Sequence, residues 1–134
     1  VPQGSILGPF LFILYVNDLS SCVSRGLLCL FADDTSLVID ESCRFNMEMN
    51  TFVQCNSIVQ WFQSNGLAMN TDKTTLLDFS ISSRRNDSLS VWVGDAEVCS
   101  EQMVKFLGLI VDRRNLTFSF HVNYVALKVC AGIF

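Results

Sequence analysis

Basic residues are scarce in this sequence. Of its 134 residues, nine are lysine or arginine and 13 are aspartate or glutamate, which gives a formal net charge of −4. Proteins that bind nucleic acid neutralise phosphates with lysine and arginine, and this balance argues against strong binding through this chain alone. We therefore expect the isolated chain to have little affinity for nucleic acid. Any such role requires most of the basic surface to lie outside it.

Long apolar runs and paired cysteines are also lacking. The longest uncharged apolar stretch, residues 6–16, is too short to span a bilayer, so no membrane partner is expected. The six cysteines form no Cys-x-x-Cys pair and follow no regular spacing, which makes a zinc site and a disulfide framework weak interpretations. Most of them lie in apolar runs, where a free thiol behaves as a small hydrophobe in a reducing, intracellular compartment.

Apolar residues, in contrast, make up 50% of a chain of one domain's length, which predicts a folded protein with a core. Both ends of the sequence look cut, so we expect a fragment of a longer protein. The pattern predicts a helix from about Pro9 to Val16 that is buried on all sides, a second over residues 41–66, and a third that begins near His121. The second helix carries a stripe that we expect to face the core: Phe45, Met49, Phe52, Val59 and Phe62.

Strands are expected between these helices. The run 27–40 and the run 91–98 each predict a hairpin, the second with its turn at Gly94 and Asp95. Residues 74–79 and 105–111 each predict a single strand, and Gly108 would allow a bend in the latter. Since hairpins imply antiparallel pairing, the fold class is α+β, with an antiparallel sheet and helices on one of its faces.

Two adjacent carboxylates, Asp33 and Asp34, interrupt the apolar run 27–40 and are expected at the tip of its hairpin. Aspartate tolerates the left-handed conformations that such a turn needs. Two like charges about 4 Å apart repel by roughly 4 kcal/mol at a protein-surface dielectric, so a divalent cation is often found beside such a pair. Oxygen ligands at a water-accessible turn suit Mg²⁺, although most such pairs are simply polar turns.

The order of these segments resembles the reverse transcriptases of non-LTR (LINE-type) retrotransposons. Residues 1–19, VPQGSILGPFLFILYVNDL, are similar to that family's segment between fingers and palm, and Phe31-Ala32-Asp33-Asp34 is similar to its catalytic turn. Two further signatures follow in the right order. The first resembles the family's helix and lysine segment, and the second its primer-grip hairpin and the run into the thumb. The first comprises Trp61, Asn65, Leu67, Asn70, Lys73 and Thr74, and the second Lys105-Phe106-Leu107-Gly108 with Asp112, Leu116 and His121.

The resemblance implies a role for each matched residue. Asp33 would bind both catalytic Mg²⁺ ions and Asp34 would contribute less directly, in a two-metal site for nucleotidyl transfer. Lys73 would stand near the pyrophosphate as a proton donor, although a solvated turn lysine would look the same. Gln3 and Gly4 would lie against the incoming nucleotide and the template, and the primer end would be held by Phe106, Leu107 and Gly108. The implied partners are an RNA template, a DNA primer and a dNTP.

The resemblance also implies how the chain is organised. Residues 1–111 would be a partial polymerase palm and residues 112–134 the start of a helical thumb. The family's metal site needs a further aspartate from a strand before residue 1, so we expect the isolated chain to be inactive as a polymerase. Loss of that strand would leave a sheet edge exposed, which predicts poor solubility.

Three other interpretations compete. The chain could be a non-catalytic remnant of a decayed retroelement. Asp34-Thr35-Ser36 is similar to the Asp-Thr-Gly turn of aspartic proteases, but Ser36 replaces the glycine and Asp33 has no place in that motif. A phosphatase or another metal hydrolase could use the same carboxylate pair, but would leave the other three signatures unexplained.

His121, the only histidine, is expected to pack rather than to bind metal.

Overall fold

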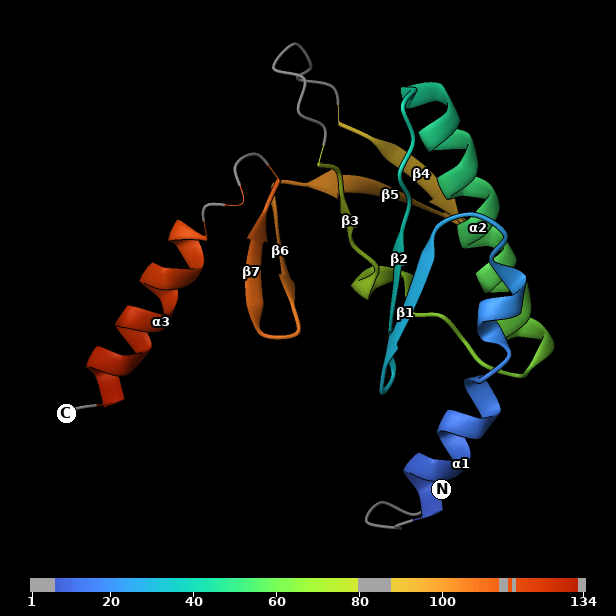
Figure 1. Ribbon diagram of the computed structural model, residues 1–134, viewed down its shortest axis with the longest axis horizontal. Helices are drawn as coiled ribbons and strands as arrows, with labels where there is room; N and C mark the ends of the chain where they lie inside the picture. Colours follow the sequence, from blue (N-terminus) through green and yellow to red (C-terminus); the bar gives the residue numbers. More distant parts are fainter. Residues whose placement is uncertain (1–6, 80–87, 114–115, 117, 133–134) are drawn as a thin grey trace. The chain divides into compact units, whose positions relative to one another are not determined.

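The structure is a computed structural model that describes residues 7–79, 88–113, 116 and 118–132. It divides into two compact units. The first holds residues 1–71 and 91–96, and the second holds residues 72–90 and 97–134. Helices and strands follow one another irregularly along the chain (Figure 1). The α+β class is therefore confirmed.

The first unit contains two of the predicted helices and the predicted hairpin. Helix α1 spans Leu7–Val16 and is followed by a short 3₁₀ helix, Leu19–Cys22. Strands β1, Leu27–Phe31, and β2, Asp34–Val38, form an antiparallel pair, and helix α2 spans Arg44–Ser64.

Helix α2 ends as its sequence predicts. Gly66 has a φ of 67°, which is left-handed backbone that glycine adopts without strain. The amide of Gly66 donates to the carbonyl of Gln63 at 3.1 Å, and the amide of Leu67 donates to the carbonyl of Phe62 at 2.8 Å. These two bonds form a Schellman cap, so the expected left-handed stop at Gly66 is confirmed.

The remaining elements lie mostly in the second unit. They are a 3₁₀ turn at Thr71–Lys73, strands β3 (Leu76–Leu77), β4 (Ser90–Val93), β5 (Ala96–Glu101), β6 (Met103–Phe106) and β7 (Leu109–Asp112), and helix α3 (Ser119–Gly132). The predicted hairpin over residues 91–98 is present as β4 and β5, with its turn at Gly94 and Asp95. Residues 91–96, which include this turn, cluster with the first unit.

Strand pairing differs in detail from the single antiparallel sheet that the sequence predicts. Among the described residues the strands form three separate sheets, in the orders β1-β2, β3-β5-β4 and β6-β7. The pair of β3 and β5 is parallel, with Leu76 opposite Ser100 and Leu77 opposite Glu101. Hairpin patterns identify only neighbours in sequence, whereas β3 pairs with a strand that comes after β4. This parallel contact could therefore not be read from local signals.

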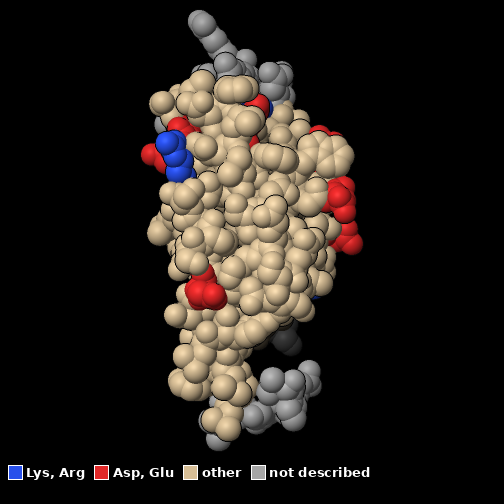
Figure 2. All heavy atoms as spheres, turned by 90° about the vertical axis from the view of Figure 1, so that its right-hand side faces the viewer, with Lys and Arg blue, Asp and Glu red and all other residues tan. Residues whose placement is uncertain are grey.

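The buried apolar core is small, and two burial predictions are wrong. Helix α1, expected to be buried on all sides, is buried only at Val16. On α2 the apolar stripe is not the buried face: Phe45 is 68% exposed, whereas Thr51, Gln54 and Ile58 are buried. Figure 2, which faces the side that carries α1 and α2 in Figure 1, shows mainly uncharged side chains. Periodicity tells which residues share a helix face but not whether anything covers it.

Asn56, which interrupts the expected stripe, attaches the turn between β4 and β5 to α2. Its Nδ2 donates to the carbonyl of Trp92 at 3.0 Å and to that of Phe52 at 2.8 Å. The amide of Gly94 donates to Asn56 Oδ1 at 3.0 Å. A polar residue within an apolar pattern here joins the helix to backbone groups of the β4–β5 hairpin.

Candidate active site

The tip of the β1–β2 hairpin carries the two adjacent aspartates. Phe31 pairs with Asp34 across the strands, so the two-residue turn consists of Ala32 and Asp33, and Asp34 is the first residue of β2. The positive φ that this turn requires, 52°, belongs to Ala32 and not to either aspartate. The expectation that aspartate is present because it tolerates left-handed backbone is therefore wrong. The hairpin itself and the position of the carboxylates at its end agree with the prediction.

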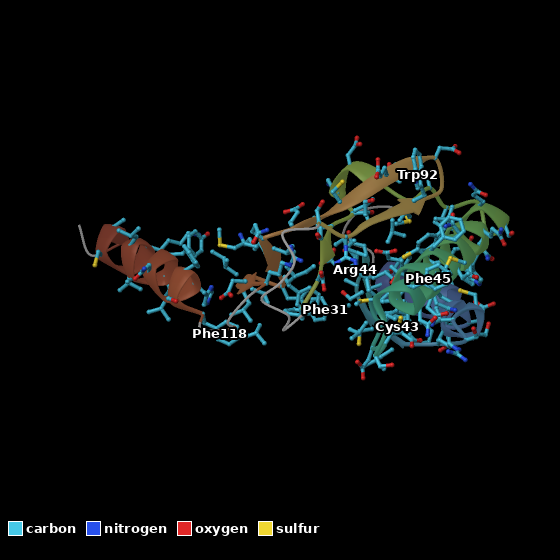
Figure 3. The ribbon with its side chains drawn as sticks, turned by 90° about the horizontal axis from the view of Figure 1, so that it is seen from above. Phe31, Cys43, Arg44, Phe45, Trp92 and Phe118 are labelled. Atoms are coloured by element: carbon cyan, nitrogen blue, oxygen red, sulfur yellow. The ribbon has the colours of Figure 1, made fainter. Side chains whose placement is uncertain are left out.

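Both carboxylates are exposed to solvent. Among the described residues no hydrogen-bond donor or cation contacts the side chain of Asp33 or Asp34, so their oxygens are open to a ligand. Opposed residues of an antiparallel pair share a face, and Asp34 therefore shares its face with Phe31, which is 64% exposed and labelled in Figure 3.

The chemistry of these two groups fits Mg²⁺, which is commonly bound by one or two carboxylates together with waters and substrate phosphates. They do not form a complete protein cage. In the described part of the chain no three His, Cys, Asp or Glu side chains are grouped so as to bind a metal.

The base of the hairpin is attached to helix α2 by polar contacts, and the Gln54 side chain that makes two of them is buried. The amide of Ser24 donates to Gln54 Oε1 at 2.9 Å, and Gln54 Nε2 donates to Ser24 Oγ at 3.2 Å. After β2, Glu41 accepts a hydrogen bond from Asn50 on α2 and lies 3.5 Å from Arg25. The residues just before β1 and just after β2 are therefore attached to neighbouring residues, whereas the turn of the β1–β2 ribbon is exposed.

Gly26 and Gln54 are the two residues on which the base of the hairpin depends. Gly26 has a φ of 103°, and a Cβ there would lie 2.6 Å from the carbonyl oxygen of Val38, so only glycine fits. The sequence interpretation missed Gln54, because a glutamine on a helix is usually solvated. No local signal marks it as buried.

The β6–β7 hairpin of the second unit holds the expected primer-grip residues. Phe106 pairs with Leu109, and the turn between them is Leu107, with a φ of 47°, and Gly108, with a φ of 87°. Two successive positive φ values define a type I′ turn. The single strand expected from residues 105–111 is therefore wrong, and Gly108 serves a turn rather than a bend. The missed signal is Gly108 itself, since glycine is favoured in such a turn.

The other predicted site residues are placed as follows. Lys73 lies in the 3₁₀ turn of residues 71–73, belongs to the second unit and is exposed. Gln3 and Gly4 fall outside the described residues. His121 accepts a hydrogen bond at Nδ1 from the amide of Ile110 at 3.3 Å, so its ring joins α3 to β7 and performs the packing role that was expected.

The sequence interpretation also missed a buried ion pair beside the β6–β7 hairpin. Arg113 Nη2 lies 2.9 Å from Asp78 Oδ2, and Arg113 Nε donates to the carbonyl of Asp78 at 3.1 Å. The Asp78 side chain is only 1% exposed. Nothing local in the sequence links Arg113 to a residue 35 positions earlier.

No helix among the described residues is long and apolar enough to cross a membrane. All six cysteines are free thiols, and Cys22 and Cys55 are partly buried. Burial raises the pKa of both thiols above the usual value.

Comparison with known proteins decides the family. The family model described as reverse transcriptase (RNA-dependent DNA polymerase) matches residues 1–111. The chain belongs to this family. The match contains the aspartate hairpin, the lysine segment and the β6–β7 hairpin, and this family is one that uses divalent metal ions. No solved structure is significantly similar to the chain.

The relatives of this reverse transcriptase chain are polymerases of mobile elements. The probable RNA-directed DNA polymerase from transposon X-element of Drosophila melanogaster is 28% identical, covering 99% of this chain and 15% of that protein. The RNA-directed DNA polymerase from mobile element jockey of the same species is 25% identical, covering 93% and 14%. A Pol polyprotein from type-1 retrotransposable element R1 2 of Nasonia vitripennis is also 25% identical, covering 98% and 33%.

These matches confirm the resemblance to non-LTR retrotransposon reverse transcriptases and give no support to a protease or a hydrolase. The chain spans about 15% of the length of the X-element polymerase.

Proposed function

We propose that this chain supplies the catalytic hairpin of an RNA-directed DNA polymerase that extends a DNA primer on an RNA template. The observation that carries the proposal is the two-residue turn between β1 and β2, which presents Asp33 and Asp34 side by side in solvent within a segment of the reverse transcriptase family. Because α2 holds the base of this ribbon through Gln54 and Glu41, the carboxylates project from a fixed support.

In this proposal Asp33 and Asp34 hold two Mg²⁺ ions, with Asp33 as the main ligand. Bound Mg²⁺ would activate the primer 3′-hydroxyl and stabilise the charge on the leaving pyrophosphate. The chain's own part is to keep two acceptor side chains adjacent and unpaired. A hairpin does this at low entropic cost, since neighbouring residues need no further folding to meet.

Other residues of the chain would position the substrates. Lys73 is a described cation with no acidic partner among the described residues, as a proton donor to pyrophosphate requires. The exposed turn Phe106-Leu107-Gly108 would hold the primer end, and Gln3 and Gly4 would contact the nucleotide and the template. In this assignment residues 1–111 are palm and residues 112–134 begin the thumb.

We propose further that the chain alone does not polymerise. Two carboxylates from one turn are a sparse ligand set for two ions. A third would have to come from outside the described residues, which hold no cluster of three candidate ligands. The alternative is a non-catalytic remnant with no activity in any context.

The test is primer extension on poly-rA/oligo-dT with Mg²⁺, in two contexts: the chain alone, and a chimera in which its residues 1–111 replace the matching segment of the X-element polymerase. We expect activity only in the chimera, and its loss in Asp33→Asn/Asp34→Asn. Asp95→Asn is a matched control, because Asp95 also follows the first turn residue of a two-residue hairpin and is exposed.

An inactive chimera that is folded would favour the remnant. If instead the double aspartate variant retains full activity, the aspartates are an ordinary turn and the proposal fails.

A further inference from the structure

Arg113, the residue directly after β7, joins three segments of the second unit. Its guanidinium contacts Asp78, just after β3, at two atoms: Nη2 lies 2.9 Å from Oδ2, and Nε donates to the carbonyl oxygen at 3.1 Å. Its backbone amide donates to the carbonyl of Gln102, between β5 and β6, at 2.9 Å. The end of β3, the bend between β5 and β6 and the end of β7 therefore meet at one residue.

The β6–β7 hairpin depends on such contacts for its direction. Among the described strands β6 and β7 pair only with each other, so no neighbouring strand fixes how the hairpin is aimed (Figure 1). Met103 pairs with Asp112 at its base, and Phe106 pairs with Leu109 at its turn. Four residue pairs at about 3.3 Å each make an arm of about 13 Å, so a tilt of about 5° at the base moves the turn by about 1 Å. Small movements at Arg113 are therefore amplified at the turn.

The Asp78–Arg113 pair is better suited to fixing a geometry than to adding stability. The two side chains are only 1% and 10% exposed, and a buried pair of charges often contributes no more net stability than apolar residues of similar volume would. A guanidinium is planar and always charged, so its two contacts with Asp78 set both the distance and the angle between the segments. A single ammonium contact would set the distance alone.

In the proposed function, the two segments that this pair joins serve the leaving side and the attacking side of one reaction. Lys73 lies on the chain just before β3 and would stand near the pyrophosphate, whereas the turn Phe106-Leu107-Gly108 would hold the primer end. Both segments belong to the second unit. Attack by the primer hydroxyl needs these groups in the right geometry, and a displacement of about 1 Å can slow a reaction about a hundredfold.

We propose that Asp78 and Arg113 are positioning residues, which fix the β6–β7 turn relative to β3 and so set the spacing between the primer end and Lys73. This inference rests on the proposed function. Both side chains are nearly buried, so they act through the hairpin that they orient and not by touching the substrate. The pair should therefore govern the rate of nucleotidyl transfer more than the affinity for the primer.

The first experiment is single-turnover primer extension in a longer chimera, in which residues 1–134 replace the matching segment of the X-element polymerase. Asp78→Asn/Arg113→Gln removes both charges together, so that neither is left buried alone. We expect its rate constant to fall at least about tenfold, with the dissociation constant for the primer duplex within about twofold of the wild type. Arg113→Lys, which keeps the charge but loses one of the two contacts, should slow the reaction only about threefold.

The rate constant separates positioning from a loss of folded protein. Partial unfolding lowers the amplitude of the single turnover, because fewer molecules react, but it leaves the rate constant of the folded molecules unchanged. The matched control is Arg44→Gln/Glu48→Gln, which neutralises a partly exposed ion pair on α2 and should keep the wild-type rate constant. The proposal is overturned if Asp78→Asn/Arg113→Gln keeps that rate constant too, if the control slows as much, or if weaker primer binding accounts for the loss.

A second readout needs no polymerase activity. In the chain alone, amide hydrogen exchange in β6 and β7 should accelerate about tenfold in Asp78→Asn/Arg113→Gln and stay unchanged in the control. Unchanged exchange in both variants would mean that the pair does not hold the hairpin, and the inference would fail even if the chimera polymerises. A folded wild-type chimera without activity would instead refute the proposed function, and with it the catalytic role of the pair, whereas accelerated exchange would still show that the pair fixes the hairpin.

Discussion

Gln54 offers the sharpest test of how the catalytic hairpin is supported. Its side chain is buried, with the residue only 2% exposed, and it both accepts from the amide of Ser24 and donates to the hydroxyl of Ser24. Gln54→Leu keeps a similar volume but removes both bonds. The amide of Ser24, two residues before the close approach at Gly26, would then lack its partner.

The expected cost follows from these contacts. A partly buried amide left without an acceptor costs about 1–3 kcal/mol, and we expect Gln54→Leu to lower the unfolding free energy of the first unit by about 2 kcal/mol. Ser24→Ala removes only the longer of the two bonds and should cost about 0.5–1 kcal/mol. In the double variant the two losses should not add, because the residues share a contact.

The assay is urea unfolding followed by tryptophan fluorescence, since Trp61 and Trp92 both belong to the first unit. Gln60→Leu is the control, because Gln60 lies on the same helix and is exposed. Hydrogen exchange of the β1 and β2 amides should accelerate in Gln54→Leu and not in the control. Equal stability and equal exchange in the two variants would refute the role assigned to Gln54.

Three further predictions concern other contacts. Gly26→Ala should lower the free energy of unfolding by about 3 kcal/mol, since its Cβ would meet a backbone carbonyl. Gly66→Ala, also at positive φ but in open space, should lower it by about 1 kcal/mol. Urea unfolding followed by tryptophan fluorescence compares the two variants. Arg113→Met should destabilise the second unit by about 3 kcal/mol, because the Asp78 carboxylate would stay buried without its guanidinium. Adding Asp78→Asn should restore part of this loss, and a thermal melt followed by circular dichroism measures both variants. Because burial raises the pKa of Cys55, iodoacetamide should modify its thiol more slowly than the exposed cysteines and need a higher pH, as peptide mass spectrometry would show.

Local chemistry predicted the elements of this fold well. The helix stop at Gly66 and the turn at Gly94 depend on backbone conformations that glycine favours, and these are readable from sequence. Burial was not readable in the same way. The stripe that includes Phe45 has helical periodicity, yet Phe45, Met49 and Phe52 are exposed and Val59 and Phe62 are only partly buried, because burial depends on what lies opposite a helix face.

In the candidate site, too, features local to the sequence were predicted and contacts distant in sequence were not. The Asp33-Asp34 pair was found because one hairpin holds both residues, so their proximity is a local property. The contacts of Gln54 and Asp78 each join residues that lie 30 or more positions apart in the sequence. Their meeting depends on tertiary packing, which no short pattern encodes.

Exposed apolar surface is the last consequence of this arrangement. The β1–β2 ribbon pairs with no further described strand, and Leu27, Phe31 and Val38 on one of its faces are exposed, as is most of α1. A two-stranded ribbon with unpaired edges and an open apolar face is marginally stable and a template for further pairing. We therefore expect the isolated chain to associate on purification, and size-exclusion chromatography with a thermal melt tests this. A monomer that melts cooperatively would contradict the reasoning, because these faces would then need no cover.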